Sequence, residues 1–579
     1  MNLVTLTING KKIELQEGST ILDAAKSLNI RIPTLCHFKL HDDKTINDPG
    51  SCRVCVVEVE GRRNLAPACS TPATNGMVVI TNSIRAIKAR RTIVELYLSN
   101  HPKECLLCAK NLHCELQSLA GELDIREIRY EGKMSHYPID NSSYSIIRNL
   151  DKCVLCRRCE TMCNEVQTCR VLSGINRGFI TNVAPAFNSP LAETNCTFCG
   201  QCVAVCPTGA LVEVDNVPKV WRALEKKDKT VVVQVAPAVR VALGELFGLE
   251  PGAIVTGKMV SALKNLGFDY VFDTNFAADL TIMEEAHEMI DRITNNRNLP
   301  ILTSCCPAWV KFFEHQFPDL LDIPSTCKSP HEMFGAITKH YFAEKMGIKE
   351  EDMIVVSVMP CVAKKYEAER PELESGGVKD VDIVITTREL GRMIKEAGIN
   401  FLLLDDEEYD HPLGESTGAA QIFGTTGGVI EAALRTAAVQ LTGGAIDKVD
   451  YTEVRGMAGL REASVKIGDL TLNLAIANGL GNARTLLESI RDGKSNYHAI
   501  EIMACPGGCI GGGGQPYHHG DLEILKKRAA GIYAIDTQHK VRMSHENVAI
   551  QELYANFLGE PGGELAHKLL HTSYFKREL

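Results

Sequence analysis

The chain has 579 residues, of which 45% are hydrophobic and 23% charged, a composition typical of a globular protein with several cores. At roughly 150 residues per domain, this length predicts about four domains. The formal net charge of −10 argues against nucleic acid or an anionic membrane as the main partner. We recognise no signal peptide and no apolar run long enough to span a membrane, so we expect a cytoplasmic protein.

The N-terminal part of the chain predicts a β-grasp domain over residues 1–82. Alternating apolar residues before Asn9-Gly10 indicate a strand, and this dipeptide is a strong hairpin-turn signal. Thr20, followed three residues later by Asp23, is typical of a capping box that opens a helix. The order strand, strand, helix favours the β-grasp fold.

Cysteine is the unusual component of the sequence, with 22 residues that are mostly clustered. A disulfide framework is typical of secreted chains, whereas clustered cysteines in a reducing cytosol more often bind metal. The first cluster suits a plant-type [2Fe-2S] site, although its first gap is much longer than the usual spacing, and a structural or zinc role is the alternative. Its candidate ligands are Cys36, Cys52, Cys55 and Cys69.

A second cluster follows a predicted helix over residues 84–98, in a small domain assigned to residues 83–130. It contains three cysteines, which cannot complete a four-iron cluster, and a nearby histidine is the obvious fourth ligand. A neutral imidazole in place of an anionic thiolate changes the charge of a cluster and therefore its potential. The candidate ligands of this [4Fe-4S] site are His101, Cys105, Cys108 and Cys114.

Residues 131–215 hold the clearest internal repeat, two C-x2-C-x2-C-x3-C runs. This pattern is typical of bacterial double ferredoxins with an α+β fold, in which the fourth cysteine of each run binds the other cluster. A pair of zinc sites is the alternative, but zinc sites rarely use three cysteines at such gaps. The two predicted [4Fe-4S] ligand sets are Cys153, Cys156, Cys159 and Cys206, and Cys196, Cys199, Cys202 and Cys163.

Residues 216–579 predict a large α/β domain, because short β-branched strands alternate with helical stretches. Four cysteines from three separated segments of this domain can supply the thiolates of a further cubane. A glycine-rich run from Cys505 to Gly514 allows the backbone to curl closely around a bulky inorganic group, and a flexible linker is the alternative. The candidate cubane ligands are Cys306, Cys361, Cys505 and Cys509.

The order of the clusters resembles the large iron–sulfur subunit of respiratory NADH dehydrogenase and the accessory domains of FeFe hydrogenases. Three segments of the α/β domain are similar, in order, to the three signatures of FeFe hydrogenases, and they are Thr303–Trp309, Met359–Glu367 and Glu501–Pro516. The resemblance covers nearly the whole chain. It implies a catalytic domain of two lobes that holds an H-cluster, in which a [4Fe-4S] cubane is joined to a diiron unit with carbonyl, cyanide and a dithiolate amine.

The resemblance also implies roles for residues around the diiron unit. Cys509 would bridge the cubane and the diiron unit, and Lys364 would hydrogen-bond a cyanide. The residues that would pack against this unit or close its pocket are Ala236, Pro237, Ser329, Pro330, Met359 and Met503. On the sequence alone, each methionine also suits an ordinary core. His331 stands where this family commonly has glutamine.

Cys305 is not needed as a ligand, and a thiol titrates close enough to neutral pH to pass protons. The resemblance implies a proton path to the surface that consists of Cys305, Glu285, Ser325, Glu288 and Arg292. Glu285 and Glu288 share one face of a predicted helix, and a solvated helix face is the alternative to a relay. The two cysteines left over, which we assign to packing, are Cys169 and Cys327.

The predicted activity is reversible hydrogen chemistry, H2 ⇌ 2 H+ + 2 e−, with electrons leaving through the accessory clusters. Gly424–Gly428 lacks the lysine of a P-loop, and Gly479–Gly481 lacks the third glycine of a dinucleotide turn, so NAD(P) and flavin sites are expected on another chain. We expect an NAD(P)-linked complex with flavoprotein subunits, either electron-bifurcating or not, and a single-chain enzyme that uses ferredoxin is the alternative. Less favoured are a non-catalytic electron conduit and a hydrogenase-like iron–sulfur assembly protein.

Overall fold

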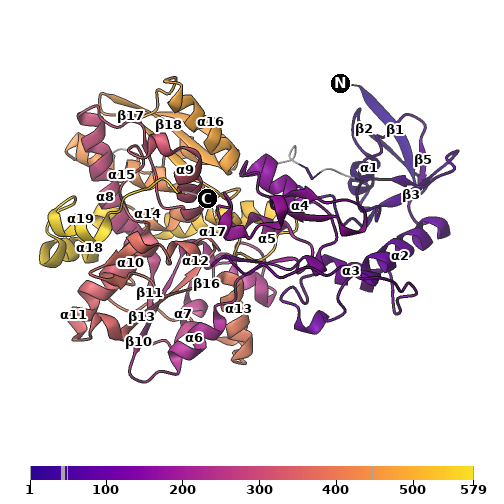
Figure 1. The fold of residues 1–579 in the computed structure, drawn as a ribbon. Coiled ribbons are helices and arrows are strands. Elements are labelled where there is room, and N and C mark those ends of the chain that lie inside the picture. Colours follow the sequence, from indigo (N-terminus) through magenta and orange to yellow (C-terminus); the bar gives the residue numbers. More distant parts are fainter. Residues whose placement is uncertain (1, 41–45, 48–49, 445–447, 578–579) are drawn as a thin grey trace.

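The computed structural model describes residues 2–40, 46–47, 50–444 and 448–577. In Figure 1 the N-terminal sheet lies at one end of the molecule, the cysteine-rich segments lie in the middle, and the remaining two thirds of the chain form a large body at the other end. No helix within the described ranges combines the length and the apolar character needed to cross a membrane.

The N-terminal domain is a sheet with the strand order β2-β1-β5-β3-β4. The predicted hairpin is confirmed, because β1 and β2 pair antiparallel and Asn9 and Gly10 take positive φ angles of 48° and 80°. The capping box is confirmed as well, since the Thr20 side chain accepts from the backbone N–H of Asp23 and the Asp23 side chain accepts from that of Thr20. The elements are β1 (Leu3–Ile8), β2 (Lys11–Gln16), α1 (Ile21–Ser27), β3 (Val56–Val59), β4 (Ala66–Pro67) and β5 (Val78–Ile80).

The middle of the molecule consists of short elements around the cysteine runs. Helix α2 packs against β3 and α3, and the buried Arg90 on α2 donates to the carbonyl oxygen of Val56 at 3.0 Å. Strands β6 and β9 pair antiparallel beside α4 and α5, an α+β arrangement. The elements are α2 (Ile84–Ser99), α3 (Glu115–Glu122), β6 (Ile146–Arg148), α4 (Arg158–Thr161), β7 (Ser173–Ile175), β8 (Asn182–Ala184), α5 (Gln201–Val205) and β9 (Leu211–Glu213).

The large body is built on two four-stranded sheets. The first, in the order β11-β10-β13-β16, is parallel throughout, and its central strands β10 and β13 are buried almost completely, as a sheet covered on both faces requires. The second has the order β12-β19-β18-β17. The strands are β10 (Thr230–Val235), β11 (Tyr270–Asp273), β12 (Ile301–Leu302), β13 (Met353–Met359), β14 (Glu374–Ser375), β15 (Val378–Lys379), β16 (Ile383–Thr386), β17 (Leu460–Ile467), β18 (Leu470–Asn478) and β19 (Ala499–Met503).

Helices cover both sheets, and α8 joins the two lobes by packing against α10 in one and α15 in the other. The helices of the body are α6 (Val217–Leu224), α7 (Thr256–Asn265), α8 (Thr274–Thr294), α9 (Pro307–Gln316), α10 (Pro330–Ile337), α11 (Ala343–Met346), α12 (Lys364–Glu367), α13 (Thr387–Glu396), α14 (Gly418–Gln421), α15 (Gly428–Thr442), α16 (Leu480–Arg491), α17 (Glu523–Gln538), α18 (Val548–Leu553) and α19 (Glu564–Leu570). The sequence therefore predicted the α/β class of this region correctly.

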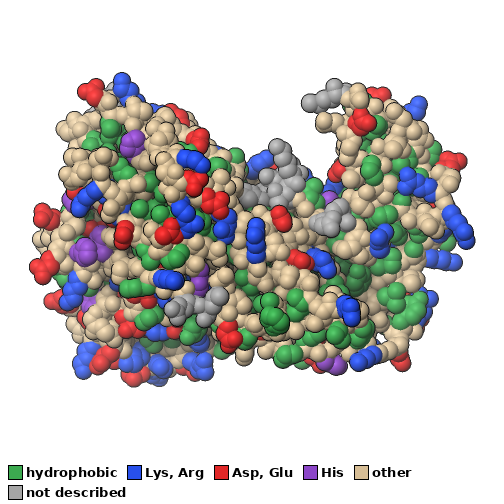
Figure 2. Space-filling model, turned by 45° about the horizontal axis from the view of Figure 1, so that its top comes forward, with side chains coloured by type: hydrophobic (Ala, Val, Ile, Leu, Met, Phe, Trp, Pro, Cys, Tyr) green, Lys and Arg blue, Asp and Glu red, His purple; other side chains and the backbone are tan. Residues whose placement is uncertain are grey.

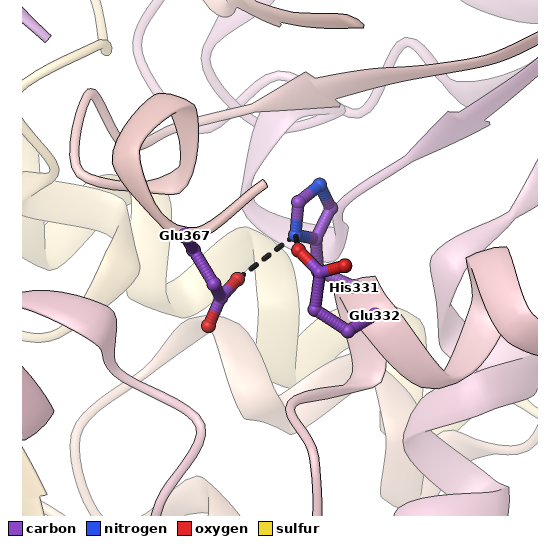
Figure 3. A group of neighbouring side chains, drawn as sticks. All are labelled: His331, Glu332 and Glu367. Atoms are coloured by element: carbon purple, nitrogen blue, oxygen red, sulfur yellow. Dashed lines mark hydrogen bonds and ion pairs between the residues drawn. The ribbon is translucent and has the colours of Figure 1, made fainter. Parts of the chain in front are cut away.

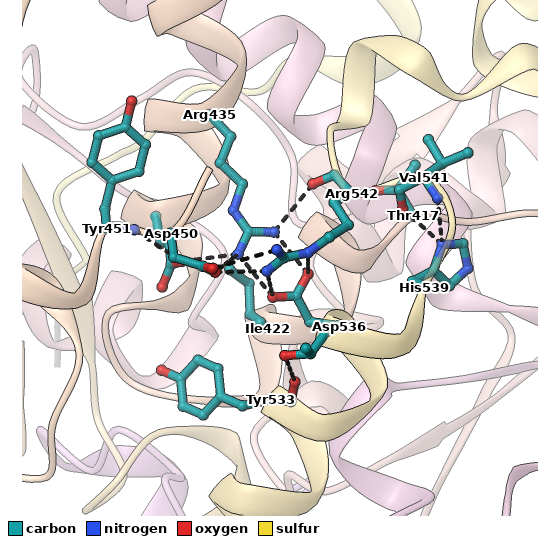
Figure 4. Close-up of polar contacts among 12 residues, drawn as sticks. Thr417, Ile422, Arg435, Asp450, Tyr451, Tyr533, Asp536, His539, Val541 and Arg542 are labelled. Carbon is teal, nitrogen blue, oxygen red and sulfur yellow. Dashed lines mark hydrogen bonds and ion pairs between the residues drawn. The ribbon is translucent and has the colours of Figure 1, made fainter. Parts of the chain in front are cut away.

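A buried charge network fastens the C-terminal part of the chain to the second lobe (Figure 4). Arg435 on α15 makes two hydrogen bonds of 2.8 Å to the carboxylate of Asp536 on α17. Arg542 donates to the same carboxylate at 2.6 Å. Removal of one member of such a network would leave a buried charge without a partner, which is strongly destabilising. These contacts therefore keep α17 attached to α15.

The face drawn in Figure 2 carries acidic and basic side chains that are interspersed, with hydrophobic side chains between them. A hollow separates the N-terminal domain from the large body on this face. Because charges of both signs are mixed on this face, it does not present a strong electrostatic potential of one sign.

Candidate active site

Two of the candidate cubane cysteines directly follow strands of the two sheets at their carboxyl ends. Cys361 lies two residues after β13 of the first sheet, and Cys505 lies two residues after β19 of the second. Cys306 caps the N-terminus of α9, and Cys509 begins a short 3-10 helix in the glycine-rich segment. The carboxyl ends of parallel strands are the usual place for a ligand site in an α/β sheet.

A buried cavity of about 80 Å³ lies where these strand ends meet, and all four cysteines line it. Its wall also contains most of the residues that the resemblance implied, which are Ala236, Pro237, Pro330, Met359, Lys364 and Met503, and the structure adds His331 to the wall. Ser329 is not part of the wall, but its hydroxyl oxygen accepts from Lys364 Nζ at 2.8 Å. Cys305 lies in the wall as well.

The chemistry of the four sulfurs fits an iron–sulfur group. Burial, together with the charge of Cys306, raises the pKa of Cys361 to about 12. Burial and the charges of Cys361, Cys306 and Cys509 raise the pKa of Cys505 well above its usual value. Four thiolates that are this close together in a buried place repel one another, so a cationic group is needed to hold them.

Glycine is required beside the cysteines because the backbone there has no room for a side chain. A Cβ on Gly512 would lie 2.1 Å from the carbonyl oxygen of Pro360. Gly508 has a φ of 92°, and a Cβ there would lie 2.6 Å from the backbone nitrogen of Thr426. This segment is therefore a tightly packed wall, and the flexible-linker alternative is wrong.

Lys364 is held at the cavity as a cation. Its Nζ donates to Glu367 at 2.6 Å and to the carbonyl oxygen of Cys305 at 3.1 Å. Burial alone lowers the pKa of Lys364, but the carboxylate of Glu367 outweighs this effect, so the pKa lies above its usual value. An ammonium group with fixed geometry suits an anionic ligand in the cavity.

Sequence reasoning missed the carboxylates beside His331. Figure 3 shows its ring next to Glu332 and Glu367, and Nδ1 lies 2.8 Å from Glu332 Oε1 and 2.9 Å from Glu367 Oε2. Glu332 follows His331 directly, whereas Glu367 comes from α12. The proximity to Glu367 is a long-range contact, and no local pattern in the sequence signals it.

Each residue of the proposed proton path contacts the next one, from the cavity outward. Cys305 lies close enough to Glu285 on α8 for the charge of Glu285 to raise the pKa of its thiol. Glu285 in turn hydrogen-bonds the side chain of Ser325. The Ser325 hydroxyl donates to Glu288 at 2.8 Å. Glu288 in turn accepts from Arg292 Nη2 at 2.5 Å. The geometry brings all five side chains together, and their role in proton transfer stays a prediction.

The free energy of unfolding is expected to depend on pH through the buried carboxyl of Glu285. Burial, together with the negative charge of Glu288, raises the pKa of Glu285 to about 8. A carboxyl whose pKa is higher in the folded chain than in the unfolded chain stabilises the fold when it is protonated. This stabilisation is complete at pH values below the pKa of the unfolded chain, and it is lost as the pH rises through the pKa of the folded chain. The melting temperature should therefore fall more steeply between pH 5 and about 8 in the wild type than in Glu285→Gln. Parallel melting curves for the two proteins across this range would contradict the raised pKa.

The C-terminal segment forms part of the surroundings of this path, which sequence reasoning also missed. The Tyr574 hydroxyl donates to the carbonyl oxygen of Ser325 at 2.5 Å. His571 lies 2.8 Å from the hydroxyl of Thr326 through Nδ1 and 3.0 Å from Glu284 Oε2 through Nε2. Residues 571–574 therefore lie against the loop that carries Ser325.

Comparison with protein families assigns the large body and its C-terminal segment. Residues 229–513 match "Iron only hydrogenase large subunit, C-terminal domain", and residues 522–577 match "Iron hydrogenase small subunit". Residues 1–83 match a 2Fe-2S iron-sulfur cluster binding domain, and residues 90–129 match the NADH-ubiquinone oxidoreductase-G iron-sulfur binding region. A 4Fe-4S binding domain matches residues 191–212.

Individual relatives agree with these families. The chain is 62% identical over 585 residues to the "NADP-reducing hydrogenase subunit HndD" of Solidesulfovibrio fructosivorans, and 100% of each chain is covered. It is 40% identical over 577 residues to "Iron hydrogenase 1" of Clostridium pasteurianum, which covers 99% of this chain and 100% of that one. The chain belongs to the iron-only hydrogenase family. A solved structure of the [FeFe]-hydrogenase HydA1 from Chlamydomonas reinhardtii matches with a TM-score of 0.57 and 43% identity, covering 63% of this chain and 100% of that one.

The iron-only hydrogenase also carries the accessory cysteine groups that the sequence predicted. In the N-terminal domain all four cysteines are buried, and Cys55 Sγ lies 3.3 Å from Cys69 Sγ. Cys36 hydrogen-bonds the side chains of both Cys52 and Cys69. The four sulfurs therefore form one group.

The next group is less tightly assembled. His101 is buried, its Nδ1 has no hydrogen-bond partner within the described chain, and burial lowers its pKa to about 4, which leaves the neutral imidazole that a metal requires. Lys152 is an electrostatic neighbour of His101 and lies 3.5 Å from Cys108 Sγ. Cys114 is an electrostatic neighbour of Cys108, whereas Cys105 is exposed. A single site for all four stays a prediction.

Two small buried cavities lie in the double-ferredoxin region of the hydrogenase. The cysteines that line one are Cys153, Cys156, Cys159 and Cys206, and those that line the other are Cys163, Cys169, Cys196, Cys199 and Cys202. The fourth cysteine of each run thus lies with the other run, which is the predicted crossed grouping. Cys169 is an additional thiol at the second cavity, and the sequence had assigned it to packing.

The double-ferredoxin region packs directly on the glycine-rich wall of the active site. Gln201 donates to the carbonyl oxygen of Gly511 at 3.0 Å, and Gln167 donates to that of Ala504 at 2.8 Å. A Cβ on Gly513 would lie 2.9 Å from the carbonyl carbon of Gly200, so the two backbones meet without side chains between them. One accessory cysteine group therefore lies next to the cavity of the hydrogenase, and Cys199 is an electrostatic neighbour of Cys505.

Proposed function

We propose that this iron-only hydrogenase exchanges electrons between H2 and NADP through partner subunits that bind the nucleotide. The similarity to an NADP-reducing hydrogenase subunit over the full length of both chains carries this proposal. The match of residues 90–129 to an iron–sulfur region of NADH-ubiquinone oxidoreductase supports it, because that region belongs to an enzyme of nucleotide oxidation. The sequence lacks a nucleotide fingerprint, so the nucleotide and a flavin are assigned to other subunits.

The four cysteines of the buried cavity would hold the H-cluster cubane, and Cys509 would be the residue shared with the diiron unit. When bound, the H-cluster supplies the iron centre at which H2 is split or formed. The chain contributes the apolar wall around it and the cationic Lys364, which lies in the wall beside the cysteines. Because the apolar wall excludes water, it strengthens the attraction between the charge of Lys364 and an anionic ligand in the cavity.

Proton transfer is assigned to side chains of the chain itself. Cys305 faces the cavity and is the first carrier, and Glu285 is the second. Because the pKa of Glu285 is about 8, its carboxyl group holds a proton near neutral pH and can exchange it with a neighbour on either side. The hydroxyl of Ser325 links Glu285 to Glu288, and Arg292 holds Glu288 in place.

Electron transfer is assigned to the accessory groups, for which we propose one [2Fe-2S] and three [4Fe-4S] clusters. Asn47 links two of the sites, because its Nδ2 donates to the carbonyl oxygens of Cys36 at 2.7 Å and Cys156 at 3.0 Å. The site with Cys108 reaches the same region through Lys152. Both outer sites therefore lead to the double-ferredoxin region and from there to the active-site wall.

Purification under anaerobic conditions from the native host tests the proposal. The expected result is that flavoprotein subunits co-elute with the chain and that the complex reduces NADP+ with H2. The isolated chain, loaded with its clusters, should evolve H2 from a reduced dye but should not reduce NADP+. If the chain instead elutes alone and exchanges electrons with ferredoxin at the full rate, the single-chain alternative is correct.

A further inference from the structure

His331 has one nitrogen that the protein leaves unused. The residue is the second of α10, is 1% exposed and lines the active-site cavity. Its Nδ1 faces Glu332 and Glu367, whereas Nε2 is buried and has no hydrogen-bond partner within the described chain. A buried polar atom without a partner is costly unless the missing partner is a group that binds there.

Charge balance favours the protonated ring. Glu367 is already paired with Lys364 at 2.6 Å, and Asp380, which also senses the charge of Glu332, is paired with Lys328 at 2.7 Å. The two carboxylate oxygens of Glu332 are buried without hydrogen bonds, and its ion pair is with His331 at 2.8 Å. Without a positive charge on the ring, this carboxylate would be buried uncompensated, which is strongly unfavourable.

The electrostatics of the ring agree with this balance. Burial alone lowers the pKa of His331, but Glu332 and Glu367 outweigh burial, so the pKa lies above its usual value. A protonated imidazole carries a hydrogen on each nitrogen. Since Nδ1 donates toward the carboxylates, Nε2 presents an N–H group that no protein atom in the described chain accepts.

A metal ion bound by this triad is a weaker explanation. The ligand atoms of His331, Glu332 and Glu367 lie within 4.8 Å of one another, as a metal site requires. The ammonium group of Lys364, however, already lies 2.6 Å from Glu367 Oε2. A second cation at the triad would be repelled by this charge, so the lysine takes the place that a metal would have.

We propose that His331 is a further cofactor-binding residue, which donates a hydrogen bond from Nε2 to an anionic ligand of the H-cluster. Glu332 and Glu367 are positioning residues that fix the ring and its charge. His331 and Lys364 thus bring two positive charges from different helices to one cavity. The inference rests on the proposed occupancy of the cavity by the H-cluster.

Infrared spectroscopy of the matured enzyme tests the role of His331. The cyanide stretching bands of His331→Leu should shift relative to the wild type, because a hydrogen-bond donor has been removed. His331→Gln, which restores an N–H donor without charge, should give bands between the two. Glu332→Gln, which removes the counter-charge of the ring, should shift the bands in the same direction as His331→Leu and by less.

A matched control is Met333→Leu, which changes a buried side chain on the same helix outside the cavity wall and should leave the bands in place. Identical bands in His331→Leu and the wild type would overturn the role of His331. If His331→Leu does not mature, identical bands in the wild type, His331→Gln and Glu332→Gln would overturn it equally. A matured wild type without carbonyl and cyanide bands would instead contradict the occupancy of the cavity, which is a separate failure.

Discussion

Cys305→Ala is expected to lower H2 turnover by about 100-fold or more while the iron content stays close to that of the wild type. A positioned proton carrier contributes roughly 10²- to 10⁴-fold to a rate. Cys305 lies in the cavity wall and is an electrostatic neighbour of Glu285, yet four other cysteines already line the same cavity. The thiol can therefore be removed without removing a cluster ligand. H2 evolution from a reduced dye, together with iron analysis of the same sample, measures both effects.

Cys327→Ala provides the control for loss of a buried thiol. Cys327 lies in the core of the first lobe, and its Sγ is 3.9 Å from Glu288 Oε2, outside the cavity wall. This variant should keep most of the turnover. A large drop in iron content in Cys305→Ala would show that Cys305 is a ligand, and unchanged turnover would show that protons take another route.

Cys361→Ala should abolish activity because the cubane of the active site loses a ligand. The cysteine lines the cavity and interacts electrostatically with Cys306, Cys505 and Cys509. The iron content should fall by the iron of one cubane and its diiron unit, while the electron paramagnetic resonance signals of the accessory clusters remain. Iron analysis and spectra of the reduced protein measure this loss.

Cys305→Ala is the matched control for this second change, since both cysteines lie in the wall of one cavity. The two variants should lose activity alike and differ in iron. If Cys361→Ala kept the iron content and the activity of the wild type, the proposed ligand set would be wrong. If the accessory signals disappeared as well, the change would have unfolded more than the site.

Sequence alone predicted the features that depend on neighbouring residues or on counted spacing. The hairpin at Asn9-Gly10 and the capping box of Thr20 and Asp23 are local, so a few residues determine each of them. The crossed grouping of Cys163 and Cys206 was also predictable, because a repeated spacing indicates how the two runs are interleaved.

The remaining features of the site depend on segments that meet only in the folded chain. Glu367 on α12 reaches His331 on α10 because both helices begin at the wall of the same cavity, and neither spacing nor composition indicates this contact. Asn47 is a single polar residue outside the cysteine motifs, yet its amide joins the backbones of Cys36 and Cys156. The role of residues 522–577 was likewise not predicted, since a helical C-terminal segment has no local feature of an active site.

The close backbone approach of Gly200 and Gly513 limits how this enzyme can be shortened. A Cβ on Gly200 would also lie 1.9 Å from Cγ2 of Val362, so the side chain of Val362 already fills the space beside this glycine. A catalytic body cut free at about residue 216 would expose Val362 and leave the carbonyls of Ala504 and Gly511 without their glutamine donors. A minimal hydrogen catalyst made from this chain will need a redesign of the newly exposed surface if the truncated protein is to be soluble and correctly folded.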